Sequence, residues 1–84
     1  MTVVEMLAVR QQILSFVERI SRFMWELDGF DGCTRDELWV CIGVPKGRQH
    51  HLYEGVLSIL LYEGVLVEAP CRRRNVDVIR QPRR

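Results

Sequence analysis

The chain has 84 residues, a net charge of +1 and 48% hydrophobic residues, which is typical of one small globular domain. This composition argues against disorder over most of the length. Three cysteines without close pairing argue against a disulfide-rich secreted scaffold. The chain starts without a leader-like segment, and no apolar run approaches the roughly 20 residues that span a bilayer, so we expect a cytoplasmic protein with no membrane contact.

Charge is divided unevenly along the chain. Residues 1–40 carry four basic and seven acidic side chains, whereas residues 41–84 carry eight basic and four acidic ones. Such a division favours a polyanionic partner for the basic half. The alternative is a solvated surface whose asymmetry arose by chance.

Residues 3–27 are predicted to form one long helix. Apolar residues recur there at three- and four-residue steps, which makes one apolar stripe. At 1.5 Å per residue the helix would be about 40 Å long, more than one side of so small a domain covers. We therefore expect either a break near residues 10–12 or a stripe that partly contacts another chain.

A second, short helix is predicted at residues 34–42. Thr34 and Glu37 form a capping-box pattern at its start, and Gly43 follows its end. Its buried side is expected to carry Leu38, Cys41 and Ile42.

The third helix is predicted at residues 45–63. Leu52, Val56 and Leu60 form the expected inner row, and Gly64 is expected to adopt a left-handed conformation just past the end. Gly55 weakens a helix interior, so it is predicted to mark a close helix crossing.

Residues 65–80 are predicted to form a β-hairpin with a basic tip. The segments 65–69 and 75–80 have strand character, and the tip contains Arg72, Arg73 and Arg74. Residues 81–84 are expected to be a frayed tail.

From about Gln12 to Arg80 this order of elements resembles the winged helix-turn-helix family of transcriptional regulators. The most diagnostic residues are Ile42-Gly43-Val44-Pro45-Lys46-Gly47-Arg48, followed by Leu52, Leu60 and Glu63-Gly64-Val65-Leu66. The resemblance implies that residues 1–84 form a single, mainly α-helical domain with a two-stranded wing.

The resemblance also implies sequence-specific binding of double-stranded DNA. The third helix would enter the major groove, and the wing would contact the minor groove or the backbone. Arg48 can pair with guanine and Gln49 with adenine, whereas Lys46 suits a phosphate. Glu54, one turn along, counts against the hypothesis because it would repel phosphate. The candidate DNA-binding residues are Lys46, Gly47, Arg48, Gln49, His50, Tyr53, Arg72, Arg73 and Arg74.

A regulator of this size reads few bases as a monomer, so a homodimer is expected to bind two half-sites. The apolar surplus at the start of the first helix supplies the predicted interface, namely Val3, Val4, Met6, Leu7 and Phe16. The alternative is that these residues complete the core of the monomer.

Other chemistries find less support in the sequence. The cysteines and histidines lack the spacing of a zinc site, so we expect no metal and no cofactor. No phosphate-binding loop or nucleophile elbow is present, so we expect no enzyme. Cys71, beside three arginines, is a candidate redox-sensitive thiol.

The main rival is a winged-helix protein-interaction module, an adaptor or an inhibitor, that does not bind DNA. The nearly neutral net charge, Glu54, and the expected exposure of Trp25, Trp39 and Tyr62 favour this alternative. A possible protein partner therefore stands beside DNA as a hypothesis.

Overall fold

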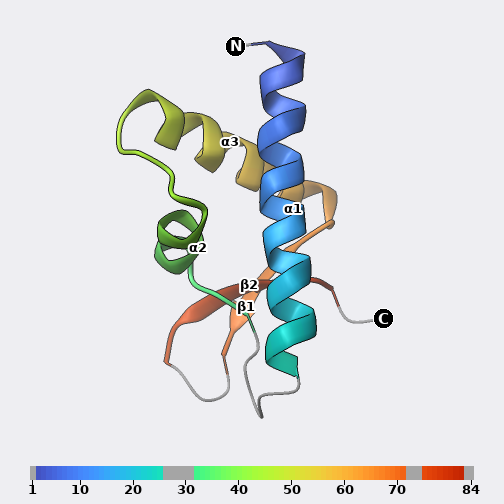
Figure 1. The fold of residues 1–84 in the computed structure, drawn as a ribbon. Coiled ribbons are helices and arrows are strands. Elements are labelled where there is room, and N and C mark those ends of the chain that lie inside the picture. Colours follow the sequence, from blue (N-terminus) through green and yellow to red (C-terminus); the bar gives the residue numbers. More distant parts are fainter. Residues whose placement is uncertain (1, 26–31, 72–74, 83–84) are drawn as a thin grey trace.

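The computed structural model describes residues 2–25, 32–71 and 75–82, and for residues 21–25 it describes the helical backbone. In chain order the elements are α1 (Val3–Trp25), α2 (Arg35–Ile42), α3 (Arg48–Glu63), β1 (Val67–Pro70) and β2 (Asp77–Arg80). Figure 1 shows α1 running the length of the molecule, with α2 and α3 on one side and the hairpin near its carboxyl end. The chain is thus mainly helical with a two-stranded antiparallel sheet, as its sequence predicted.

Helix α1 is continuous over 23 residues, so there is no break near residues 10–12. It buries Val9, Ile13 and Val17, which follow one another at four-residue steps on one face. At 1.5 Å per residue it is about 34 Å long, close to the longest extent of the molecule, 39 Å. In Figure 1 its first two turns stand clear of the other elements. The predicted end of this helix, residues 26–27, lies outside the described residues.

Helix α2 begins with the predicted capping box. The Glu37 amide donates to Thr34 Oγ1 at 3.2 Å, and the Thr34 amide donates to Glu37 Oε1 at 3.0 Å. Gly43 ends the helix in a left-handed conformation, with φ 81°.

Two side-chain predictions for α2 are wrong. Trp39, expected to be exposed, is only 5% exposed and belongs to the core, whereas Cys41, expected to be buried, is exposed. The helix turns Leu38 and Trp39 toward α1 and α3, which leaves Val40 and Cys41 in solvent. A helix of eight residues is too short for its apolar pattern to settle this rotation.

Helix α3 begins at Arg48, three residues later than predicted. Gly47 precedes it with φ 114°, which is outside the helical region and favours glycine. The helix ends at Glu63 and the left-handed Gly64, as predicted.

The inner face of α3 differs in part from the predicted row. Val56, Leu57 and Leu60 are buried, whereas Leu52 is half-buried. Gly55 is exposed, and a Cβ built on it would meet nothing within 4 Å. The predicted helix crossing at Gly55 is therefore wrong, because this residue faces solvent.

The two strands pair from Val67 with Arg80 to Pro70 with Asp77. Cys33, between α1 and α2, adds an isolated bridge to Ile79, with N···O distances of 3.2 and 2.7 Å. A Cβ at Gly32 would lie 2.3 Å from the Ile79 carbonyl oxygen, so this close approach requires glycine. The order Cys33, β2, β1 thus attaches the hairpin to the start of α2. The predicted tail is described as far as Pro82 and has no regular structure there.

One hydrophobic core joins the three helices and the hairpin. Its members come from every element except β1, and they are Val9, Ile13, Val17, Cys33, Leu38, Trp39, Val56, Leu57, Leu60, Leu66 and Ile79. This core fixes which face of α3 is covered and which face remains in solvent.

Candidate nucleic-acid interface

The beginning of α3 is basic and accessible. Lys46, Gly47, Arg48 and Gln49 are all exposed. Within the described part of the chain, neither Lys46 nor Arg48 has an ion-pair partner. Both charges are therefore available to an external anion.

A stripe of exposed residues continues along α3 from this end. Its members follow at steps of three and four residues, which places them on one face of the helix. We call this set the outward stripe, and it consists of Arg48, His51, Gly55, Ser58 and Tyr62. Two of its five members are small, and none is acidic.

Both glutamates of α3 point away from the outward stripe. Glu54 Oε2 accepts from Arg35 Nη1 at 3.1 Å, and Glu54 Oε1 accepts from Trp39 Nε1 at 2.7 Å. Glu63 Oε2 accepts from Arg10 Nη1 at 3.1 Å. The repulsion expected from Glu54 is thus offset, because its carboxylate is paired with an arginine of α2.

Arg35 connects three elements of the fold. Besides Glu54 on α3, its guanidinium donates to both carboxylate oxygens of Glu68 on β1, at 2.9 and 3.3 Å. The hydrogen bond with Glu68 and the charges of Glu68 and Glu54 raise the pKa of Arg35 against the opposing effect of its partial burial. Arg35 therefore fixes α3 and the hairpin relative to α2.

His50 and Tyr53, two predicted DNA contacts, lie on the inward side of α3. Their rings meet the Trp39 ring edge-on, with centroids 6.1 and 6.0 Å away. The Tyr53 hydroxyl donates to Gln12 Oε1 on α1. In this structure both side chains hold α3 against its neighbours.

The predicted basic tip, Arg72 to Arg74, lies outside the described residues. The strand ends that lead to it, at Pro70 and Asp77, lie toward the left of Figure 1, as does the start of α3. Helix α2 lies between the two regions in this view.

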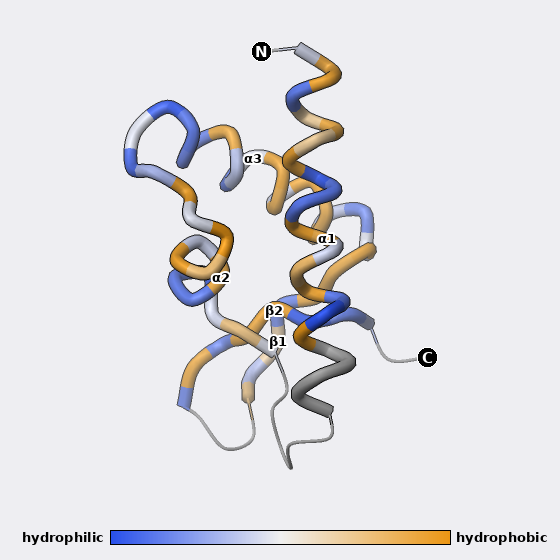
Figure 2. The backbone as a smooth tube through the Cα atoms, in the orientation of Figure 1, coloured by the Kyte–Doolittle hydropathy of each residue, from blue (hydrophilic) through white to orange (hydrophobic). Residues whose placement is uncertain are grey.

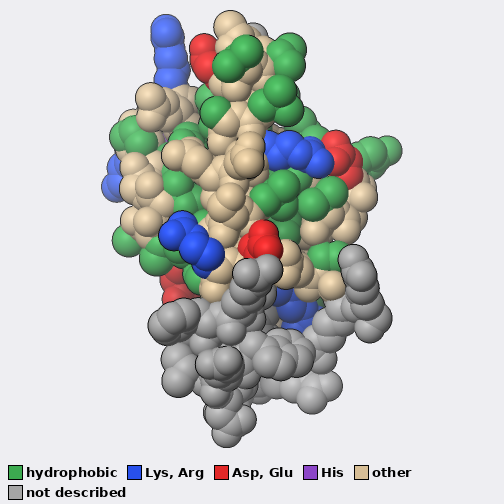
Figure 3. Space-filling view, turned by 45° about the vertical axis from the view of Figure 1, so that its right-hand side comes forward, with side chains coloured by type: hydrophobic (Ala, Val, Ile, Leu, Met, Phe, Trp, Pro, Cys, Tyr) green, Lys and Arg blue, Asp and Glu red, His purple; other side chains and the backbone are tan. Residues whose placement is uncertain are grey.

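The predicted dimer residues fall into two groups. Val3, Val4 and Leu7 are 72%, 75% and 57% exposed, whereas Met6 is half-buried and Phe16 packs partly against the core. Figure 3 shows hydrophobic side chains gathered over the upper end of α1. Figure 2 shows that apolar residues already occur in its first turns.

The cysteines are scattered rather than clustered. Cys33 and Cys71 are buried and Cys41 is exposed. In the part of the chain that the structure describes, no three His, Cys, Asp or Glu side chains gather as a metal site would require. The burial of Cys71 limits its access to oxidants.

His51, Ser58 and Tyr62 belong to the outward stripe but were not among the predicted site residues. Their spacing from Arg48 was the signal that could have found them, since the residues opposite the buried row must face solvent. Among residues 2–25, 32–71 and 75–82, no helix is long and apolar enough to cross a bilayer. Comparisons with protein-family models, curated proteins and solved structures find no match to this chain.

Proposed function

We propose that this protein is a winged helix-turn-helix transcriptional regulator that binds double-stranded DNA through α3. The order of α1, α2, α3 and the hairpin supports this, because it is the order of elements that the sequence resemblance implied. The single observation that carries the proposal is the outward stripe together with Lys46 just before it: Lys46 and Arg48 have no ion-pair partner among the described residues, and no member of the stripe is acidic.

The chemistry of the stripe suits a DNA groove. A helix fits the major groove, and its amino-terminal residues reach the base edges. Arg48 would pair with guanine and Gln49 with adenine, while Lys46 would bind phosphate. Gly55 and Ser58, further along, present little bulk to the groove wall.

Arg72, Arg73 and Arg74 are proposed to contact the minor groove or the flanking phosphates. Arginine is the side chain most often inserted into a narrow minor groove, where the negative potential is enhanced. Such contacts would add affinity with little dependence on the sequence of the bases.

A homodimer is proposed to carry two such helices to half-sites about one DNA turn apart. The exposed apolar side chains Val3, Val4 and Leu7 at the start of α1 support this arrangement. They would pair with the same residues of a second copy around a two-fold axis.

DNA binding is tested by fluorescence anisotropy with a mixed-sequence duplex, titrated at several salt concentrations. We expect the duplex to bind at low salt with a dissociation constant of about 1–100 μM. The logarithm of the association constant should fall as the logarithm of the salt concentration rises. Lys46→Gln should reduce that slope by about one unit. Arg19→Gln removes the same charge from α1 and should leave the slope unchanged. Absence of an anisotropy change at low salt would refute DNA binding.

A protein-interaction module is the second candidate. Tyr62, which is 93% exposed, ends the outward stripe next to the partly exposed Ile59, so the far end of α3 presents apolar surface. An adaptor or inhibitor of this kind would not bind DNA, and it would use Tyr62 to bind its protein partner. If DNA binds at the cationic end of α3, Tyr62→Ala should leave the affinity for mixed-sequence DNA unchanged.

A further inference from the structure

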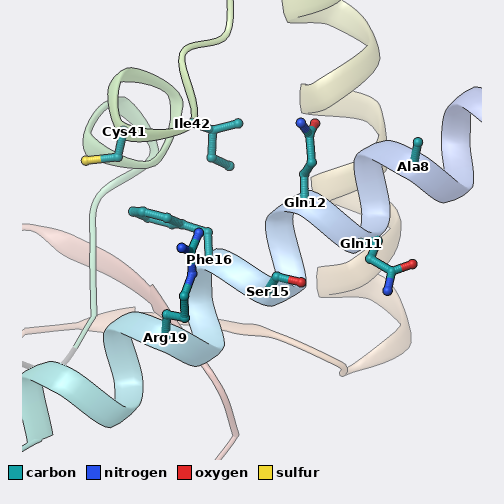
Figure 4. Close-up of a pocket in the computed structure, with 8 residues that line it drawn as sticks. All are labelled: Ala8, Gln11, Gln12, Ser15, Phe16, Arg19, Cys41 and Ile42. Carbon is teal, nitrogen blue, oxygen red and sulfur yellow. The ribbon is translucent and has the colours of Figure 1, made fainter.

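A groove lies between α1 and α2, away from the outward stripe. It has a volume of about 460 Å³, within the roughly 300–1,000 Å³ of typical small-molecule sites. Figure 4 shows side chains of α1 and the end of α2 arranged around it. Its lining consists of Ala8, Gln11, Gln12, Ser15, Phe16, Arg19, Cys41 and Ile42.

Arg19 gives the groove a positive character. Among the described residues that line the groove it is the one charged side chain, and no acidic side chain accompanies it. Arg19 is exposed and has no ion-pair partner among the described residues. A guanidinium in this situation favours a carboxylate, which it can bind through two parallel hydrogen bonds.

The rest of the lining divides into an apolar and a polar part. In Figure 4 the Phe16 ring extends from α1 toward α2, where Ile42 lies, and both side chains are half-buried and pack against the core. Gln12 and Ser15 supply neutral donors and acceptors from the adjacent turn of α1. An apolar surface beside one cation suits a ligand with a planar aromatic ring and one carboxylate.

We propose that this groove binds a small aromatic carboxylate. The carboxylate pairs with Arg19, the ring packs against Phe16 and Ile42, and polar substituents bond to Gln12 or Ser15. Binding therefore depends on the charge of the ligand as well as on its apolar area.

Gln12 links the groove to α3. Its carbonyl oxygen accepts from the Tyr53 hydroxyl, and the Tyr53 ring contacts Trp39, which donates to Glu54. A ligand that takes up Gln12 would release Tyr53 and alter how α3 is held. This regulatory role rests on the proposed DNA binding, whereas the ligand site itself does not.

The site is tested by titrating ¹⁵N-labelled protein with 2-naphthoate and following amide shifts. We expect shifts at Ser15, Arg19 and Ile42 with a dissociation constant on the order of 0.1–1 mM. Arg19→Gln should weaken 2-naphthoate binding about tenfold or more. The neutral 2-naphthamide should bind the unchanged protein as weakly as 2-naphthoate binds the Arg19→Gln variant. Arg10→Gln, which removes an arginine of α1 outside the groove, should bind 2-naphthoate as the unchanged protein does.

Absence of saturable shifts at the groove, or equal binding of 2-naphthamide, would overturn the proposal. A second measurement is the DNA titration of the same protein without ligand. Naphthoate shifts in a protein that retains no DNA would refute the proposed function and leave the ligand site standing. DNA binding in a protein that shows no naphthoate shifts would refute the ligand site and leave the proposed function standing.

Discussion

The inward and outward faces of α3 use their polar residues in opposite ways. Away from the outward stripe, the half-buried Glu54 and the exposed Glu63 are paired with arginines of α2 and α1. On the outward side, Arg48 and His51 are exposed on a face without acids. One helix thus combines a face that determines its position with a face that is available to a partner.

This comparison also explains why a nearly neutral chain can present a basic surface. The acidic groups of α3 are not removed from the sequence but are matched within the fold. Net charge counts paired and unpaired groups equally, whereas a partner meets each paired carboxylate with its charge offset by the neighbouring guanidinium.

The largest expected effect follows from truncating the inward face. Leu57 is completely buried, so Leu57→Ala should lower the free energy of unfolding by about 2–5 kcal/mol, measured by urea denaturation. Ser58→Ala, at the next position on the outward face, should change it by less than about 0.5 kcal/mol. Equal effects at the two positions would contradict the assignment of the faces.

The next largest effect is expected on DNA affinity, from a change on the outward face. Arg48→Gln should weaken binding to a duplex selected in vitro by about 5- to 100-fold, since one bidentate base contact contributes about 1–3 kcal/mol. Its urea denaturation midpoint should match that of the unchanged protein. Loss of affinity with a parallel loss of stability would instead indicate a structural role.

A smaller effect is expected from the ion pair that holds α3 to α2. A double-mutant cycle with Arg35→Gln and Glu54→Gln should give a coupling energy of about 0.5–1 kcal/mol, because both side chains are partly solvated. The glutamine at position 54 keeps an acceptor for Trp39, so the cycle isolates the charge. A coupling energy near zero would mean that the contact does not help to orient α3.

An effect of similar size but opposite sign is expected at Gly55. Gly55→Ala should stabilise the protein by about 0.5–1 kcal/mol, since alanine favours the helix and nothing surrounds the new Cβ. A destabilisation measured by thermal unfolding would restore the helix crossing that the sequence suggested.

Local signals predicted the helices well. The capping box at Thr34 and Glu37 and the left-handed Gly64 depend on a few neighbouring residues, and both lie where the sequence placed them. The long apolar stripe of α1 likewise defined its direction of burial.

Features that depend on tertiary contacts were missed. The burial of Trp39 requires Glu54 of another helix as acceptor for its indole nitrogen. The bridge from Cys33 to Ile79 joins residues that are far apart in sequence. The helical spacing indicates that α3 has an exposed face, and the burial of Leu57 then fixes the rotation of the helix and so the residues of that face.

DNA binding through the outward stripe is tested most directly by titrating ¹⁵N-labelled protein with a short duplex and mapping the amide shifts. It predicts that the largest shifts occur at Lys46, Arg48, His51 and Gly55, with little change at Val9, Ile13 and Val17. Shifts confined to the first turns of α1, or no shifts at low salt, would contradict it.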